Sequence, residues 1–170
     1  MASLMEELLG ALKDEEQQYE TLISLNSVKR EAVIKADIKA LEEVTVKEQE
    51  AASALLNLSN KRSRVLNDMA TVLGKDADEM TINKMIGYLE NQPGEQQQLI
   101  EQRDRLIEAG TRMQIMNQQN EVLLKQALEM VEFDLTLLRS MRQAPETANY
   151  DKNAYNTGDL LGGSAFDARQ

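Results

Sequence analysis

The sequence contains no cysteine, no histidine and no tryptophan, and it has only two prolines. Without cysteine or histidine, the chain cannot form disulfides, the usual zinc ligand sets, Ser/His or Cys/His catalytic pairs, or the Glu-x-x-His di-iron bundle. An enzyme made from this chain would have to work with carboxylates, Lys, Arg, Tyr and hydroxyl groups alone. We therefore expect no cofactor, no metal site and no enzymatic activity.

Basic residues and long apolar runs are also scarce. The 170 residues carry 19 Lys and Arg against 29 Asp and Glu, a formal charge of −10, whereas binding to phosphate backbones needs clustered basic side chains. No run approaches the roughly 20 apolar residues that span a bilayer, and the polar faces are too acidic for a membrane-surface helix. The first residues also lack the basic and apolar regions of a signal peptide. We expect a cytoplasmic protein that neither binds nucleic acid nor inserts into a membrane.

What the sequence does contain is helical periodicity. Hydrophobic side chains make up 42% of the chain but aromatic ones only 4%, a composition that allows one elongated core of Leu, Ile, Val, Ala and Met. Apolar residues recur at spacings of three and four, which is the period of one helical face. The expected helices cover about residues 4–35, 38–73, 81–90 and 93–142.

Local signals mark most of the helix ends. Asp37 can accept from the free amides of a following helix, and Thr81 can do the same for the short third one. Gly74 tolerates the left-handed backbone of a helix end, and Pro93 suits a first helical position. The break at Ala36–Asp37 has neither glycine nor proline, so one rod over residues 4–73 is also possible. We predict a hairpin there because a monomer must fold back to bury its apolar stripe.

The predicted fold is all-α: an elongated antiparallel three-helix coiled-coil bundle with a short connecting helix, spanning residues 1–143. Its second helix is shorter than the last one and would cover it only to about residue 130. Beyond that point the last helix keeps more apolar surface than a helix end normally leaves in water. These residues are Met130, Val131, Phe133, Leu135, Leu137, Leu138 and Met141. This end is predicted to bind a partner or to self-associate.

Polar residues interrupt the stripe of the last helix at Asn117, Asn120 and Asp134. One interpretation is that a buried Asn sets the helix register, as single polar residues do in coiled coils. The other is that these side chains form hydrogen bonds to a bound segment. The spacing alone leaves both interpretations open.

The composition changes at Ala144, where glycine, proline, Asn and Asp replace the helical pattern. Residues 144–170 are predicted to be a flexible C-terminal tail. Apolar side chains recur in it at Tyr150, Tyr155, Leu160, Leu161 and Phe166. The tail is either disordered throughout or folds on a partner through these side chains.

These features in this order resemble the flagellar export chaperones of the FlgN type, which hold the hook-filament junction proteins before type III export. The resemblance covers nearly the whole chain. It is carried by the opening amphipathic helix, the junction Arg30 to Leu41, the short helix Met80 to Leu89, the segment Asn117 to Leu124, and an ending Tyr155 to Gln170 that contains Phe166-Asp167-Ala168-Arg169. None of these motifs is a chemical signature, and the resemblance depends on their joint order and spacing.

The resemblance implies that the chain binds hook-associated proteins through their terminal helices and delivers them to the flagellar type III export apparatus. It places binding on the C-terminal part, where the uncovered helix end also lies. The partner-binding residues that it implies are Asn120, Leu123, Leu124, Ala127, Leu128, Val131, Leu135, Leu138, Tyr150, Tyr155, Leu161 and Phe166. Ordinary core packing is the alternative for Asn120, Leu123, Leu124 and Ala127.

Two other function classes compete with this interpretation. A structural coiled-coil or oligomerisation module without a client would form a stable dimer and would tolerate removal of residues 144–170. A carboxylate-based enzyme would use Glu42-Glu43 or Asp76-Asp78-Glu79, but these are adjacent or loop charges that are typical of a solvated surface. The sequence leaves open which junction protein binds, the stoichiometry, and whether the tail covers the binding face or contacts the client.

Overall fold

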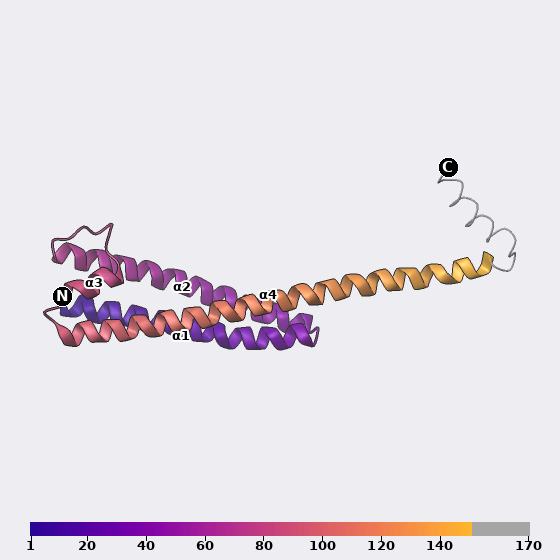
Figure 1. Cartoon of the computed structure of the whole chain (residues 1–170), viewed down its shortest axis with the longest axis horizontal. Helices are drawn as coiled ribbons and strands as arrows, with labels where there is room; N and C mark the ends of the chain where they lie inside the picture. Colours follow the sequence, from indigo (N-terminus) through magenta and orange to yellow (C-terminus); the bar gives the residue numbers. More distant parts are fainter. Residues whose placement is uncertain (151–170) are drawn as a thin grey trace. The chain divides into compact units, whose positions relative to one another are not determined.

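The computed structural model describes residues 1–150 of the backbone, with side chains through residue 142. These residues contain helices and no strands: α1 (Ala2–Ile34), α2 (Ile38–Val72), α3 (Ile82–Tyr88) and α4 (Pro93–Tyr150) (Figure 1). The expectation of an all-α fold is confirmed for these residues. The predicted site residues Tyr155, Leu161 and Phe166, and Leu160 beside them, lie outside the described residues.

The chain divides into two compact units, Met1–Leu124 and Lys125 onward. In the first unit α1 and α2 are antiparallel neighbours. Lys29 near the end of α1 contacts Glu48 of α2 at 3.1 Å, whereas Glu15 nearer its start accepts from Arg62 at 2.7 Å. The predicted reversal at Ala36–Asp37 is therefore confirmed.

The first part of α4 runs beside α1 in the same direction. Gln102 of α4 donates to Glu16 of α1 at 2.7 Å, Arg112 pairs with Glu20, and Asn120 donates to the carbonyl oxygen of Asn26 at 2.8 Å. Residue numbers thus rise together along the two helices.

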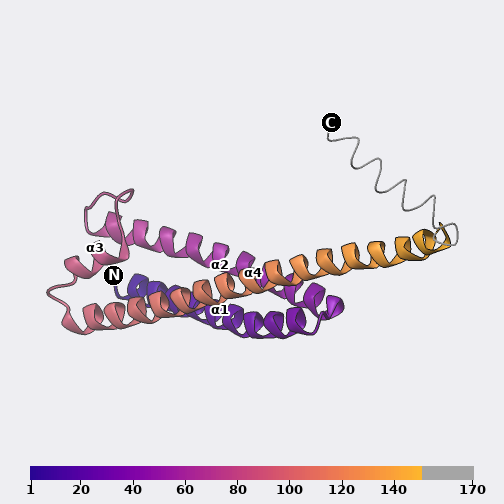
Figure 2. The ribbon, with the colours of Figure 1, turned by 45° about the vertical axis from the view of Figure 1, so that its right-hand side comes forward.

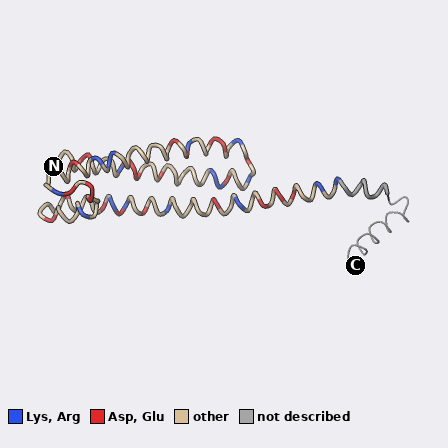
Figure 3. Tube along the Cα trace, turned by 90° about the horizontal axis from the view of Figure 1, so that it is seen from above, with Lys and Arg blue, Asp and Glu red and all other residues tan. Residues whose placement is uncertain are grey.

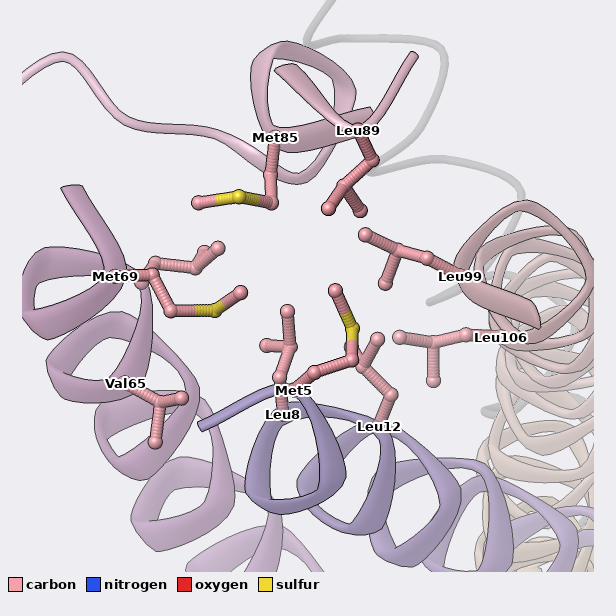
Figure 4. Close-up of a cluster of buried hydrophobic side chains, with 10 residues drawn as sticks. Met5, Leu8, Leu12, Val65, Met69, Met85, Leu89, Leu99 and Leu106 are labelled. Carbon is pink, nitrogen blue, oxygen red and sulfur yellow. The ribbon is translucent and has the colours of Figure 1, made fainter. Parts of the chain in front are cut away.

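The hydrophobic core cluster lies at the end of this unit where α1 begins and α2 ends. Helix α3 closes that end (Figures 1 and 2). Side chains from all four helices and their caps point into one interior (Figure 4). The cluster consists of Met5, Leu8, Leu12, Val65, Leu66, Met69, Met85, Leu89, Leu99 and Leu106. None of these buried members is aromatic, and Tyr19 packs against the cluster as a partly buried neighbour.

The caps form as the sequence predicts. The side chains of Asp37 and Thr81 accept from the amides of Ala40 and Lys84, at 3.0 and 3.2 Å. Gly74 has φ +63° and closes a Schellman motif, in which its amide donates to Thr71 and that of Lys75 to Ala70. The first helix ends with the same motif, but here the left-handed residue is Ala36, at φ +52°.

This pair of turns gives opposite expectations for two single substitutions. Gly74→Ala places a Cβ on a left-handed backbone and should lower the free energy of unfolding by about 1 kcal/mol. Ala36→Gly removes such a Cβ and should raise it by about 0.5–1 kcal/mol. Urea unfolding followed by circular dichroism measures both. A loss of stability in Ala36→Gly would contradict the assignment of a left-handed cap at this turn.

The last helix is longer than predicted. We expected it to end at about residue 142 with a flexible tail from residue 144, but α4 continues to Tyr150. Pro145 lacks the amide that would bond to the fourth preceding carbonyl, yet its fixed φ is compatible with a helix. A proline inside a helix removes this hydrogen bond and crowds the same carbonyl, at a cost of about 3 kcal/mol or more, but α4 continues past it. Tyr150, predicted as a tail anchor, is the last residue of α4.

Candidate functional site

The part of α4 after Leu124 exposes a broad apolar face. At 100° per residue its apolar side chains occupy roughly half of the helix circumference. Eight exposed large hydrophobic residues lie in this part, and seven of them fall within that half, whereas Phe133 lies roughly 40° beyond Leu137. We call this set the distal face, and it consists of Leu128, Met130, Val131, Leu135, Leu137, Leu138 and Met141. Contiguous apolar surface of this kind marks an interaction site in a folded protein.

The opposite side of the same segment is polar. It carries Lys125, Glu129, Glu132 and Arg139, all of them exposed. Thr136 and Ser140 lie there too, and their hydroxyls donate to backbone carbonyls four residues earlier, at 3.0 and 3.1 Å. In the described residues, Lys and Arg are dispersed among acidic residues (Figure 3). The segment is thus amphipathic, and in the described residues its apolar side is exposed.

The predicted site residues fall into two groups. Asn120 is only 5% exposed and donates to both the carbonyl and Oδ1 of Asn26, at 2.8 and 3.2 Å. Leu123, Leu124 and Ala127 are partly buried. Leu128, Val131, Leu135 and Leu138 are exposed and belong to the distal face. Among the predicted residues whose side chains the structure describes, these last four are the exposed ones.

The three polar residues in the stripe of α4 differ in environment. Asn120 is buried and bonded within the first unit, as the register interpretation requires. Asn117 is exposed and its amide contacts the sulfur of Met113 at 3.0 Å. Asp134 is also exposed, and it lies within the distal face. One interpretation thus does not fit all three residues.

Sequence reasoning missed two buried polar partners in α1, Asn26 and Glu15. Asn26 is 1% exposed and Glu15 is 2% exposed. Both are polar residues that lie three or four positions from apolar members of the α1 stripe, and that spacing was the available signal. Burial raises the pKa of Glu15, and the neighbouring Arg62 partly offsets this by lowering it. Arg62 binds Glu15 Oε2, while Oε1 has no partner among the described residues.

The carboxylates considered for catalysis are either exposed or bonded to neighbouring residues. Glu42 and Glu43 are exposed on α2. Asp76 accepts from the amide of Asp78 at 3.0 Å in the connection before α3, and Glu79 pairs with Lys84 at 3.4 Å. Among the described residues, no group of three or more acidic side chains could hold a metal ion.

None of the helices within residues 1–150 has an apolar stretch sufficient to cross a membrane. Neither the curated proteins nor the solved structures include a significant match to the chain. A scan against protein-family models, in contrast, matches residues 1–158 to the family described as FlgN protein. The match includes all four helices. The chain therefore belongs to the FlgN family of flagellar export chaperones.

Proposed function

We propose that the chain binds hook-associated proteins, the hook-filament junction proteins, through their terminal helices on the distal face of α4. It keeps them unpolymerised in the cytoplasm until the flagellar type III export apparatus takes them over. The observation that carries this proposal is an exposed amphipathic segment on a member of an export-chaperone family. The first unit serves as an antiparallel three-helix coiled-coil bundle that supports α4, and no chemical step is involved.

The distal face suits helix-in-groove recognition. Helical partners bind such surfaces by placing apolar anchors at spacings of three and four against a matching stripe. Full burial of a Leu or Val side chain contributes about 1.5–3 kcal/mol, so the face has more than enough apolar area for micromolar binding after the costs of association. Met130 and Met141 are flexible and can repack around more than one client.

Calorimetric titration of the full chain with terminal segments of the junction proteins tests this function. Leu135→Ala/Leu138→Ala should weaken binding by about 30-fold, because each truncation of a well-packed anchor costs about 1 kcal/mol or more. Phe133→Ala is the matched control, since Phe133 is equally exposed but lies roughly 140° around the helix from Leu138. Equal losses in the two variants would argue against this face.

A version of the chain that ends at Gln143 decides between two roles for residues 144–170. Tighter client binding on truncation would mean that the tail covers the face, and weaker binding would mean that Tyr150, Tyr155, Leu161 and Phe166 contact the client. If no junction-protein segment binds the full chain, the structural coiled-coil module becomes the better explanation. That alternative predicts a stable dimer of the full chain.

A further inference from the structure

Asp134 lies at the centre of the distal face. At 100° per residue, Leu138 and Val131 are roughly 40° and 60° from it on one side, and Met141 and Met130 are roughly 20° and 40° away on the other. In the described part of the segment, no other charged side chain lies next to Asp134. Lys125, Glu129, Glu132 and Arg139 lie at least roughly 140° away, and Arg142 lies roughly 80° away on the side of Val131 and Leu135, eight residues and roughly 12 Å further along the helix.

The helix itself offers Asp134 no counter-charge. Side chains on a helix meet their neighbours three and four positions away. For Asp134 these are Met130, Val131, Leu137 and Leu138, which are all apolar. Consistently, no ion pair within the described residues involves Asp134.

Exposure makes this arrangement harmless in the free chain, because water solvates the carboxylate. A partner helix that covers the distal face removes that water. Burying a carboxylate without a cation or hydrogen-bond donors is strongly unfavourable and offsets part of the apolar gain. The occupant must therefore bring the compensating group.

We propose that the helix bound by the distal face carries an arginine or lysine within its own apolar stripe, and that this cation pairs with Asp134. The inference rests on the proposed function and specifies which client helices fit. A guanidinium suits the position best, since it is weakly hydrated and can bind both carboxylate oxygens. A helix with a wholly apolar or acidic stripe leaves Asp134 buried and unpaired, and is rejected.

A comparison of two isosteric substitutions in the full chain tests the pairing. Asp134→Asn should weaken binding of the junction-protein segments about tenfold or more, because it removes one member of a desolvated charge pair. Glu129→Gln is the matched control: it removes the same charge from the polar side of the same helix and should change affinity less than twofold. Circular dichroism of both variants should match that of the unchanged chain, since both side chains are exposed.

A second measurement identifies the cation. Each Arg and Lys of the bound segment is replaced by Gln in turn and titrated against the unchanged chain and Asp134→Asn. One replacement should weaken binding to the unchanged chain and have little further effect on Asp134→Asn. Asp134→Lys should then recover binding to a segment with Glu at that position.

Three outcomes overturn the inference, and they are distinguishable. If the segments bind Asp134→Asn and the unchanged chain equally well, the proposed charge pair does not form, but the proposed function still holds. If no segment binds the full chain, both the charge pair and the proposed function are wrong. If sedimentation shows that the full chain dimerises and that Asp134→Asn abolishes the dimer, the distal face binds a second copy of this chain.

Discussion

Leu8→Ala is expected to lower the free energy of unfolding by about 2–5 kcal/mol, a large part of the stability of a small domain. Leu8 of α1 is 0% exposed and packs in the cluster to which α2, α3 and α4 also contribute side chains (Figure 4). Truncation leaves a cavity that three converging elements cannot all move to fill. Chemical unfolding followed by circular dichroism measures the loss.

Leu56→Ala is the control for this prediction. Leu56 belongs to α2 and is 64% exposed, so the same truncation should change stability by less than about 0.5 kcal/mol. A loss below about 1 kcal/mol in Leu8→Ala would contradict the packing of this cluster as the core of the first unit. Because Leu8 is not in the distal face, client affinity at low temperature should be unchanged in the folded variant.

Arg62→Met is expected to destabilise the bundle by about 2–3 kcal/mol at pH 7 and by less than about 1 kcal/mol near pH 5. Arg62 is the cation that faces the buried carboxylate of Glu15, at 2.7 Å. Its removal leaves a carboxylate that is 2% exposed and has no counter-charge. Met preserves most of the side-chain volume, so the loss reports on the charge and not on packing.

The sign of this pH dependence follows from the pKa of Glu15, which burial raises above its ordinary value of 4.5. The folded state then holds the Glu15 proton more tightly than the unfolded state. Stability due to this group therefore falls as pH rises from 4.5 through the folded pKa. Without Arg62 the folded pKa rises further and the fall becomes larger. Acidification protonates the carboxyl and removes most of the cost.

Two variants check that the effect belongs to the Glu15–Arg62 pair. Glu15→Gln/Arg62→Met has no buried charge and should show little of the added pH dependence. Lys84→Met breaks the exposed pair with Glu79, whose side chains are 48% and 72% exposed, and should change stability by less than about 1 kcal/mol. A loss in Arg62→Met that is equal at pH 5 and pH 7 would contradict a charge origin.

Local sequence signals predicted most helix boundaries because the interactions that end or begin these helices join residues close together in the chain. Asp37 and Thr81 bond to amides three residues away, and Gly74 supplies its own left-handed turn. The left-handed residue at Ala36 could not be predicted, because alanine has no preference for that conformation. The end of α4 was predicted too early because Pro145 is a statistical stop signal and not an absolute one.

Long-range polar pairs were beyond sequence reasoning for a different reason. Asn26 and Asn120 are 94 residues apart in the chain, and Glu15 and Arg62 are 47 apart. Periodicity shows that each side chain lies on an apolar stripe, but the partner depends on how the helices align. The distal face could be predicted because the prediction used only two features of the sequence. These are the helical spacing of the apolar residues and the greater length of the last helix compared with the second.

The pair between Asn26 and Asn120 also determines how many residues of α4 lie beside α1. A slide of α4 along α1 by one heptad, about 10 Å, would keep the apolar stripes in contact. It would, however, place Met113 or Ala127 where Asn120 now lies, and leave the buried Asn26 carbonyl and amide without their partner. The first unit is thereby held to a single alignment, and the segment that we propose to bind the client keeps a constant length.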